Sequence, residues 1–599
     1  MFLTSVEVDN FRNLNGFTAR FHPGLNLIVG RNGTGKSNLF RAIRLALGPA
    51  ASYGDMAWLV PDDRHQVGPE PTTKPIRISL TFAGLSEPER VMYFDILEYD
   101  SDSPERSLAR IHFEATWDAG RERFLPRRWG GPLQGDRTEV PPEVLQSIPL
   151  TFLPALRDAE SALSPGRASR LARLLDYASR EEPGVDHETR VVEIFKKAND
   201  ALATSELVRT VEGRLADNTE AMAGADFVAP SIAASPPRFG RILKSLRVLL
   251  PDNPVQELSA AGLGYNNLLF IATVLAQLRD SPEGDTPLLL IEEPEAHLHP
   301  QLVSRLGRFL AGHLGEGRPP QTLVASHSPL LASQVKPSQT SVFFHSSQSG
   351  SARCSSLRSI ELTDVEERKL FRMLDITRAT MYFARGLILV EGLSEELLVP
   401  PLARLLDVDL SSEQVSVLPA YGVGFDTLAN VLGPKGLDVR VAILTDADPE
   451  VNRHNGWRSD APEVDGAGNF PRSDRTENLI SKFQEHPSVR VFSSDLTLEY
   501  DLAAPTKANA QLMAEVWRDQ YPQSPVVTPD LVNATGSSQE AALTVWRGIC
   551  RSETSGSKAE FAHSLAERLS DTTTEDFEVP AYIRQAIEWV CPSPEATTP

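Results

Sequence analysis

The chain has 599 residues, enough for roughly two to four domains with full hydrophobic cores. Hydrophobic residues make up 41% of it and charged residues 23%, and its three cysteines lie too far apart in sequence to indicate a disulfide framework or a zinc site. The formal net charge of −21 does not favour nucleic-acid binding by the surface as a whole, although local basic patches could still provide it.

The N-terminal region is predicted to be rich in β-strands. Residues 2–9 alternate as a strand does and lack the basic and apolar segments of a secretory signal, so we expect a cytoplasmic protein. A buried strand at 24–30 runs into a glycine-rich turn, and a helix is expected at 36–48. Further strands are expected at 76–82 and 110–117, after a polar loop.

A nucleotide-binding motif lies between the buried strand and the helix. The stretch "GRNGTGKS", Gly30–Ser37, fits the pattern G-x-x-x-x-G-K-S in the strand–turn–helix context that this motif requires. Its backbone N–H groups would wrap the β-phosphate of ATP, Lys36 would reach the β- and γ-phosphates, and Ser37 would bind Mg²⁺. The nucleotide-binding residues predicted here are Gly30, Asn32, Gly33, Gly35, Lys36, Ser37 and Asn38.

Residues 160–225 change character, with helical periodicity and few strand signals. The interval of about 220 residues after the P-loop, which includes this stretch, lacks the hundreds of heptad residues of SMC-like proteins, and a helical insertion of about 65 residues is better suited to dimer contacts. Two basic clusters lie outside this stretch, and each fits a solvated face or a phosphate-contact surface equally well. They are Arg121, Arg123, Arg127 and Arg128, and Arg238, Arg241, Lys244 and Arg247.

Two later strands are predicted to end in residues suited to nucleotide hydrolysis. An apolar run delivers Glu292 and Glu293 at its C-terminal end; the first would orient Mg²⁺ through water and the second would polarise the attacking water. His327 ends another strand about 35 residues later and would contact the γ-phosphate, although a lone histidine is more often structural. The apolar stretch Leu268–Ala276 is too short to span a bilayer, so we expect no membrane attachment.

The segment "LSAAGLGYNNLL", upstream of the two acids, resembles the signature loop of ABC-type ATPases, as does the order P-loop, signature, Glu-Glu, His. This resemblance implies that Ser259 and Gly262 or Gly264 donate to a γ-phosphate at a helix N-terminus, and that ATP is sandwiched between two ATPase units. It therefore implies a homodimer, with a tetramer left open. It also implies that "PEAHLHP" is the equivalent of the D-loop. A Q-loop should lie between residues 57 and 74.

For that Q-loop, Gln66 is a candidate and Asp62 and Asp63 compete with it. The sequence does not decide among the three.

The last third of the chain alternates between strand-like and helix-like segments from residue 386 to 448, which indicates parallel strands with crossover helices. Glu391 ends one such strand, and Glu395 lies on the first turn of the next helix. Asp446 and Asp448 end another strand in "ILTDADP" and, being two residues apart, share a direction. We therefore expect these acids to meet at the carboxyl edge of the sheet, where α/β folds place ligands.

Carboxylates that converge without matching lysines repel one another unless cations lie between them. Oxygen-only ligands favour Mg²⁺, Mn²⁺ or Ca²⁺ over zinc. Two such ions about 4 Å apart would activate water and stabilise the leaving oxygen in phosphodiester cleavage. The competing interpretation is that these are surface acids on unrelated loops.

The pattern E-G-x-x-E followed by D-x-D resembles the Toprim domain of topoisomerases, primases and certain nucleases. An ABC-type ATPase followed by Toprim resembles the OLD (overcoming lysogenization defect) family of ATPase-nucleases over nearly the whole chain. "TFLPALRDAE" is similar to a family segment before the helical insertion. The resemblance further implies Glu499 of "LTLEYDL" and Thr445 as members of the metal shell, and Lys558 of "GSKAEFA" near the scissile phosphate.

Two departures leave the subgroup open. "AYGVGFDTL" only loosely matches the second Toprim strand of the family, and Glu292 stands where many ATPases have aspartate. Some family members stand alone and others work beside a helicase-like partner in phage defence. The resemblance also leaves open the DNA preference, nicking against double-strand cleavage, and whether ATP hydrolysis activates or inhibits the cut.

The fold expected is α/β, an ABC-type ATPase with a helical dimerisation insertion followed by a Toprim domain with C-terminal helices. Its expected parts are the ATPase at 1–159, the insertion at 160–240, the rest of the ATPase at 241–375, and Toprim with its helices at 376–599. We expect an ATP-hydrolysing, divalent-metal-dependent DNA endonuclease in phage defence or DNA repair. The alternative is a RecF/SMC-like repair ATPase whose Toprim domain binds DNA without cutting it. A topoisomerase would need a nucleophilic tyrosine in a separate DNA-binding domain, which is not apparent.

Overall fold

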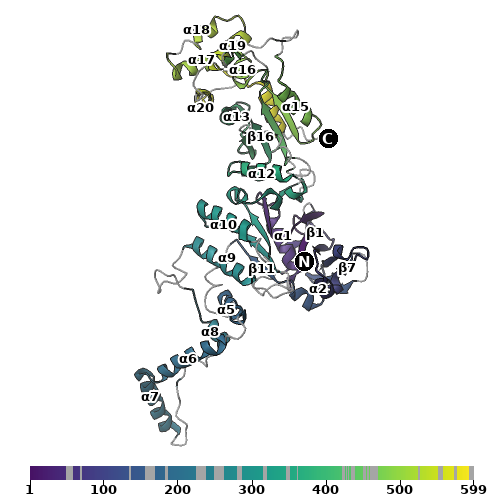
Figure 1. Cartoon of the computed structure of the whole chain (residues 1–599), viewed down its shortest axis with the longest axis vertical. Coiled ribbons are helices and arrows are strands. Elements are labelled where there is room, and N and C mark those ends of the chain that lie inside the picture. Colours follow the sequence, from purple (N-terminus) through teal and green to yellow (C-terminus); the bar gives the residue numbers. More distant parts are fainter. Residues whose placement is uncertain are drawn as a thin grey trace.

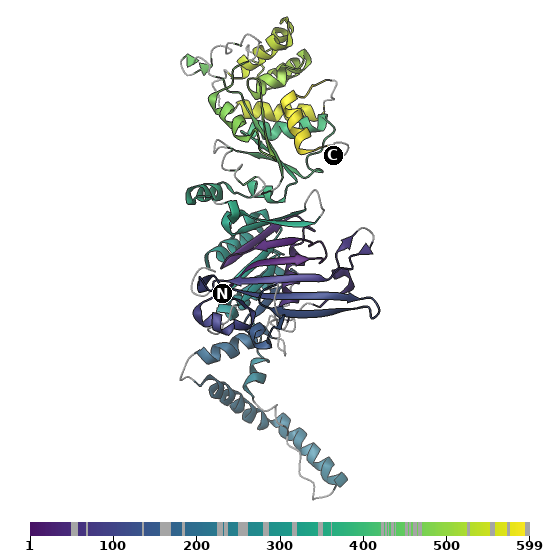
Figure 2. The ribbon, with the colours of Figure 1, turned by 90° about the vertical axis from the view of Figure 1, so that its right-hand side faces the viewer.

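The computed structural model shows an elongated molecule with three parts (Figures 1 and 2). A two-sheet body lies in the middle, an arm of helices projects from one end, and a smaller α/β domain lies at the other. The α/β fold class expected from the sequence is confirmed. The structure describes residues 1–48, 58–67, 70–133, 137–155, 169–181, 186–223, 232, 238–248, 262–279, 287–313, 320–345, 351–360, 362–420, 425, 428, 431–432, 437, 439–449, 453–454, 457–458, 464, 470–523, 527–550, 557–571 and 576–592.

The first sheet of the body is antiparallel and has seven strands. The helix α1 (Lys36–Ala46) packs on this sheet and buries Leu39, Phe40 and Ile43 in a core that also includes strands of the second sheet. The strand order is β10 (Thr138–Glu139), β9 (Arg123–Gly130), β8 (Leu108–Asp118), β6 (Ile76–Ala83), β1 (Phe2–Asp9) and β2 (Phe17–Arg20), with β7 (Leu97–Glu98) beside β8.

The second sheet joins segments from both sides of the helical insertion. Its order is β11 (Leu150–Leu153), β12 (Leu288–Glu292), β13 (Gln321–Ser326), β3 (Leu25–Gly30), β14 (Thr340–His345) and β15 (Ala352–Ser356). All neighbours are parallel except β14 and β15. Because β12, β13 and β3 run side by side in one direction, the residues that follow each of them meet at one edge of the sheet.

Further helices and a small hairpin complete the body. They are α2 (Glu87–Met92), α3 (Pro142–Gln146), α10 (Pro300–His313), α11 (Pro329–Ala332), η2 (Pro61–Asp63), η3 (Phe94–Ile96), η4 (Pro104–Arg106), η6 (Pro337–Gln339), η7 (Leu357–Ile360) and the hairpin β4 (Gln66–Val67) and β5 (Glu70–Pro71).

The arm carries apolar side chains that nothing in the described structure covers. It contains α5 (Arg170–Glu181), α6 (His187–Ala203), α7 (Glu206–Ala223) and α8 (Phe239–Leu243), and α5 packs on α8 and on α9 (Leu263–Arg279). No residue of α6 is buried. The large apolar residues exposed on α6 and α7 are Ile194, Leu202, Leu207, Val211, Leu215 and Met222.

The second domain is built on a four-stranded sheet in which every neighbouring pair is parallel, as the alternating sequence predicts. Its strand order is β17 (Val415–Pro419), β16 (Gly386–Val390), β18 (Arg440–Thr445) and β21 (Val489–Ser493). The connector consists of α12 (Asp364–Met373) and η8 (Arg378–Phe383), and η8 contacts both β3 and β17. One hydrophobic core therefore runs from the second sheet of the body into this domain.

Helices surround the small sheet and cover its C-terminal side. They are α13 (Leu393–Leu405), α15 (Asp474–Phe483), α16 (Leu498–Ala503), α17 (Lys507–Gln520), α18 (Pro529–Asn533), α19 (Ser538–Cys550), α20 (Ser557–Ser570) and α21 (Ala581–Val590), and a separate hairpin pairs β19 (Arg453–His454) with β20 (Trp457–Arg458). Among the helices that the structure describes, none is both long and apolar enough to cross a membrane.

Candidate active sites

The P-loop follows β3 directly and holds its lysine in a buried position. The Lys36 ammonium donates to the carbonyls of Gly30 at 2.7 Å and Arg31 at 2.9 Å, and it lies 3.3 Å from Nδ1 of His327. Burial lowers the pKa of Lys36 to about 8, although three glutamates nearby oppose that shift. Gly30 has φ +145°, and a Cβ there would lie 2.3 Å from the Phe343 carbonyl oxygen, so only glycine fits this point.

The predicted hydrolytic residues lie beside that lysine. Glu293 follows β12 with φ +42°, and its N–H donates to the Ala325 carbonyl on the neighbouring strand. His327 follows β13, and its Nε2 is 3.9 Å from Oε1 of Glu293. Burial and the charge of Lys36 lower the pKa of His327, which favours the neutral ring. The structure thus brings Lys36, Glu293 and His327 together at one edge of the sheet.

Glu295 belongs to the same site, and sequence reasoning did not single it out. Its Oε1 accepts hydrogen bonds from Ser326 Oγ at 2.7 Å and from the His327 N–H at 3.0 Å. Among the described residues its buried Oε2 has no hydrogen-bond partner. Burial raises the pKa of this carboxyl. In the sequence, Glu295 is the third acid of "EEPE" and lies inside the segment predicted to be the D-loop, which is the feature that could have pointed to it.

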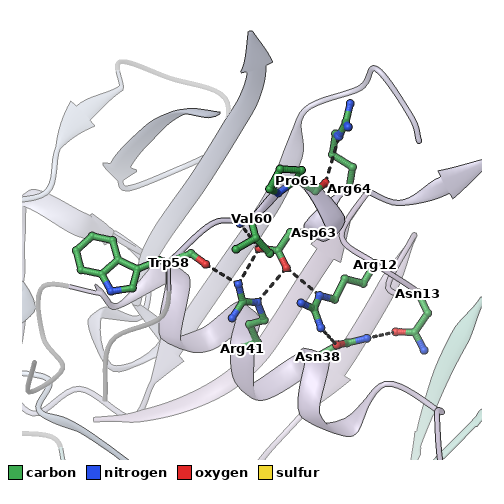
Figure 3. A network of polar contacts seen from close by, with 9 residues as sticks. All are labelled: Arg12, Asn13, Asn38, Arg41, Trp58, Val60, Pro61, Asp63 and Arg64. Atoms are coloured by element: carbon green, nitrogen blue, oxygen red, sulfur yellow. Dashed lines mark hydrogen bonds and ion pairs between the residues drawn. The ribbon is translucent and has the colours of Figure 1, made fainter. Parts of the chain in front are cut away.

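The nucleotide-binding loop is braced by a polar network from the first sheet, shown in Figure 3. Asn13 donates to the Gly33 carbonyl at 2.9 Å and accepts from Asn38 at 2.7 Å. Arg12 donates one hydrogen bond to Asn38 and another, at 2.8 Å, to Asp63. Arg12 and Asn13 come from the "FRN" stretch, whose role the sequence did not reveal.

The three Q-loop candidates differ in their surroundings. Asp63 is fully buried and forms ion pairs with Arg12 and Arg41 at 2.8 and 2.9 Å. Burial would raise the pKa of Asp63, but the hydrogen bonds from Arg41, the Val60 amide and Arg12 hold it below its ordinary value. Asp62 and Gln66 are exposed.

Only the last part of the signature segment, from Gly262 onward, lies within the described residues. Ser259 lies outside the described residues. Gly262 is exposed, with open space around the position of a Cβ. Gly264 lies on the first turn of α9, where a Cβ would be 2.5 Å from the His297 carbonyl oxygen. One helical turn later, the side chain of Asn267 donates to the carbonyls of Pro294 and Ala296, which also lie in the loop after β12. The helix after the signature therefore packs closely against the turn that carries Glu293 and Glu295.

In the second domain, the acids predicted to converge do approach one another. Glu391 follows β16 and accepts from Thr445 Oγ1 at 2.5 Å and from the Asp446 N–H at 3.2 Å, so the ends of β16 and β18 are tied together. Glu395 accepts from the Gly392 N–H at 3.1 Å. Asp448, with φ +44°, lies just after β18.

Asp446 is held by a loop that sequence reasoning did not identify. Its Oδ1 accepts from the Leu498 N–H at 2.9 Å and from Ser494 Oγ at 3.3 Å. Asp501 in turn accepts from the N–H groups of Asp495 and Leu496, which fixes that loop. Asp501 lies inside "LTLEYDL", where only its neighbour Glu499 was singled out.

Glu499 is buried on α16 and pairs with Lys558 on α20 at 2.7 Å. Burial would raise the pKa of Glu499, but the charge of Lys558 holds it below its ordinary value. Burial would likewise lower the pKa of Lys558, and the charge of Glu499 outweighs that effect and raises it. The structure thus places Lys558 against Glu499, and its predicted position near the scissile phosphate stays a prediction.

The acidic set is electrostatically strained. Burial and then the charges of Glu499, Glu391, Glu395 and Asp448 raise the pKa of Asp446 well above its ordinary value. Burial and nearby acids raise the pKa of Glu395 to about 6. As the described side chains stand, no three His, Cys, Asp or Glu residues converge tightly enough to chelate one ion. The donors are all oxygens and their charges repel, so the set fits hard divalent cations, which would draw it together.

The first basic cluster lies along β9 and the turn before it. Arg128 caps α1 by donating to the carbonyls of Ala46 at 2.7 Å and Leu45 at 3.0 Å, so it is committed to the fold. Arg127 lines a cavity of about 660 Å³ together with Trp58, which is 65% exposed. The second cluster lies on and beside α8. Most of "AYGVGFDTL" and the end of "TFLPALRDAE" lie outside the described residues.

Two family models match this chain. One, described as an AAA domain of a putative AbiEii toxin in a type IV toxin–antitoxin system, matches residues 25–333, just over half of the chain. The other, described as the TOPRIM domain of overcoming-lysogenization-defect-like proteins, matches residues 382–448 and includes Glu391, Glu395, Asp446 and Asp448.

Among individual proteins, the chain is 27% identical over 462 residues to the OLD nuclease of Thermus scotoductus, covering 74% of this chain and 82% of that one. It is 47% identical to the DNA replication and repair protein RecF of Caldanaerobacter subterraneus over only 66 residues, 11% of this chain and 18% of that one. The solved C-terminal region of the Xanthomonas campestris OLD protein is 28% identical, with 35% of this chain and 94% of that one covered and a TM-score of 0.24.

The AAA-domain match and the Toprim match fall in the order in which the two sites occur, and the OLD nuclease alignment covers 74% of the chain. The chain therefore belongs to the family of that AAA domain and, with its Toprim domain, is a member of the OLD (overcoming lysogenization defect) family of ATPase–Toprim proteins.

Proposed function

We propose that this protein is an ATP-binding and ATP-hydrolysing DNA endonuclease whose Toprim domain cuts phosphodiester bonds with divalent metal ions. Mg²⁺ is the cation that we assign to the ATPase site, and Mg²⁺, Mn²⁺ or Ca²⁺ to the Toprim site. Nicking and double-strand cleavage are both compatible with this chemistry, as are roles in phage defence and DNA repair. We assign it to the cytoplasm.

One observation carries the proposal. Glu391 and Asp446, which are far apart in sequence, meet at the carboxyl edge of a parallel sheet, joined by the hydrogen bonds of the Asp446 N–H and Thr445 to Glu391. Glu395, Asp448 and Glu499 are close enough to raise the pKa of Asp446. A chain gains nothing in stability from burying so many like charges, which supports a cation-binding role.

The side chains divide the work as follows. Glu391, Glu395, Asp446, Asp448 and Glu499 would hold the ions, and Thr445 keeps Glu391 oriented. The bound ions would supply an activated water and stabilise the leaving oxygen.

Lys558 places a positively charged side chain beside the acids of the Toprim site. Its side chain is 46% exposed while its ammonium touches Glu499, so it can meet a phosphate of DNA at the same edge of the site.

The ATPase half uses the residues gathered at the end of β3, β12 and β13. Lys36 and Ser37 would bind the phosphates and Mg²⁺, with Glu292 completing the Mg²⁺ site through water. Glu293 would polarise the attacking water and His327 would contact the γ-phosphate. The signature residues would act on ATP held by a second copy, so the ATPase requires a homodimer.

The test compares plasmid and linear DNA cleavage with Mg²⁺, Mn²⁺ and Ca²⁺, with and without ATP, by the wild type, Glu391→Gln, Asp446→Asn and Lys36→Ala. Both Toprim variants should lose cleavage while keeping ATP hydrolysis, and Lys36→Ala should lose hydrolysis. Undiminished cleavage by both Toprim variants would refute the nuclease assignment. The exposed Asp102→Asn variant, at a residue with no predicted role in either site, is the control.

The RecF/SMC-like alternative, a Toprim domain that binds DNA without cutting it, is less well supported. The RecF match covers 11% of the chain, whereas the OLD nuclease alignment covers 74% and extends to both domains. ATP hydrolysis stimulated by DNA, with no strand breaks at any divalent cation concentration, would favour this alternative.

A further inference from the structure

The P-loop touches the Toprim domain directly. Arg31, the second residue of "GRNGTGKS", extends its guanidinium to Gln414, and Nη1 donates to Oε1 at 2.7 Å. Gln414 immediately precedes β17 and has φ +56°. A nucleotide-binding loop and a nuclease-type domain are thus joined by one hydrogen bond between residues 383 positions apart.

Gln414 also lies where two strands of the small sheet begin. Its carbonyl accepts from the Arg385 N–H at 2.9 Å, and Arg385 is the residue before β16. The parallel pairing of β16 and β17 then runs to Val390 and Pro419, and the next residue after Val390 is Glu391. A five-residue strand, roughly 17 Å long, therefore separates the Arg31 contact from the first acid of the Toprim site.

The far end of β17 is fixed as well. Arg378 of η8 donates to the Pro419 carbonyl at 3.2 Å, and the Ala420 N–H donates to the Val390 carbonyl at 2.8 Å. Because η8 also packs against β3, the strand that leads into the P-loop, β17 is held between the two domains at both of its ends. A shift at Gln414 would therefore move β17 as a unit with the end of β16.

The Arg31 contact is suited to being broken and remade. The acceptor is a neutral amide, and the Arg31 guanidinium is partly buried near the like charge of Arg385. The main chain of Arg31 is also engaged, because its carbonyl accepts from the Lys36 ammonium at 2.9 Å. That ammonium would have to turn toward the phosphates of a bound nucleotide, which would leave the Arg31 carbonyl with Thr34 as its donor.

We propose that the Arg31–Gln414 hydrogen bond couples the nucleotide state of the P-loop to the position of β17 and thereby to the Glu391 end of the Toprim site. Arg31 and Gln414 act as positioning residues for the metal-binding acids. This inference rests on the proposed function only for its consequence, the control of cleavage by ATP. The coupling itself concerns nucleotide binding and strand dynamics.

The test is amide hydrogen exchange of residues 386–390 and 415–419 in the full chain, with Mg²⁺ throughout and with or without a non-hydrolysable ATP analogue. Gln414→Asn keeps a residue that tolerates positive φ but withdraws the amide by one methylene. Gln414→Glu keeps the acceptor. Gln484→Asn makes the same change as the first variant at an exposed position of the same domain. Arg31→Met removes the donor of the other partner, keeps an apolar stem and serves as the second variant.

In the wild type and in the Gln414→Glu and Gln484→Asn variants, the analogue should change the amide exchange rates of both strands by about fivefold or more. In the Gln414→Asn and Arg31→Met variants, this change should fall below about twofold, while fluorescence titration still shows analogue binding. An unaltered response in both of these variants overturns the inference, as does a wild type that binds the analogue with no change in either strand. Because no DNA is present, a chain that responds as expected but never cuts DNA supports the coupling and refutes only the nuclease proposal.

Discussion

The Lys558 ammonium lies 2.7 Å from Oε1 of Glu499, so a cation from α20 reaches the one acid of the Toprim set that comes from α16. This ion pair makes Glu499 the member of the set whose pKa is lowered, while the pKa values of Glu395 and Asp446 are raised. The positive charge is thus concentrated at one side of the acidic set, where a phosphate of DNA would approach.

Replacing Lys558 by Met should separate cleavage from metal binding. Cleavage should fall by about 100-fold or more, because the charge that meets the phosphate is lost. Binding of Mn²⁺, followed as an increase in Tm, should persist, because every acid remains. Lys369→Met, at an exposed position of α12, is the control. Cleavage at the wild-type rate by Lys558→Met would remove this lysine from the catalytic residues.

Replacing Asp446 by Asn should stabilise the metal-free protein while destroying the site. The wild-type carboxyl has a raised pKa in the folded state, so its ionisation costs folding free energy at neutral pH, on the order of 1 kcal/mol or more. Asparagine keeps an oxygen for the Leu498 and Ser494 hydrogen bonds and removes the charge.

The measurement is Tm in a chelator and in Mn²⁺ at pH 7.5. The variant should melt higher than the wild type in the chelator and should gain little from the ion. A variant that melts lower than the wild type in the chelator would show that repulsion among the acids is not significant. When the pH is lowered toward the range in which Asp446 is protonated, the difference in Tm between the variant and the wild type in the chelator should become smaller.

Asp63→Asn should destabilise the ATPase body and should do so only above acidic pH. Asp63 is fully buried between Arg12 and Arg41, and removing its charge would leave both guanidiniums short of a partner, at a cost of about 2 to 4 kcal/mol. Because its folded pKa is lowered, this stabilisation is present above the unfolded value near 3.8 and is lost as pH falls through the folded value.

Urea unfolding of Asp63→Asn at pH 7 and at pH 3 checks this prediction. The loss of unfolding free energy relative to the wild type should be largest at pH 7 and should become smaller at the lower pH. Asp62→Asn, an exposed neighbour, should unfold like the wild type at both. An equal loss at the two pH values would mean that packing, not charge, explains the Asp63 effect.

Gly264→Ala should slow ATP hydrolysis without unfolding the chain. A Cβ at this position would lie 2.5 Å from the His297 carbonyl, so α9 would have to move away from the turn that carries Glu293 and Glu295. Hydrolysis should fall by about tenfold or more, because the acids would shift relative to Lys36. Gly312→Ala on α10 has open space around its Cβ and is the control. Hydrolysis rates equal to the wild type in both variants would show that α9 does not position the acids.

The sequence predicted the parts of both sites that follow from strand periodicity. A strand end followed by acids can be read locally, and the parallel alternation of the last third placed Glu391 near Asp446, as the structure has them. Glu295, the "FRN" pair and the loop that holds Asp446 could not be predicted this way, because their roles come from contacts between distant segments. The Arg31–Gln414 hydrogen bond is the extreme case, since no local pattern relates a P-loop to the start of a strand 383 residues later.

The exposed arm should carry the interface of the homodimer that we propose for the ATPase. Leu207 is 75% exposed and Met222 81% exposed on α7, and apolar residues of this size are seldom left uncovered in such numbers on one arm. Leu207→Lys combined with Met222→Lys should weaken dimerisation by about tenfold or more, because two charges would enter the buried centre of the interface. ATP hydrolysis should then depend more steeply on protein concentration.

Sedimentation and light scattering at micromolar concentration, with and without ATP, test this prediction. The control is Val365→Lys, a residue that is 65% exposed on α12; Figure 1 shows α12 and the arm at opposite ends of the two-sheet body. The control should remain dimeric and hydrolyse ATP like the wild type. A monomeric wild type in both conditions, or an arm variant as dimeric as the control, would place the interface elsewhere. Loss of hydrolysis at low concentration that returns at high concentration would show that the second copy completes the ATPase site.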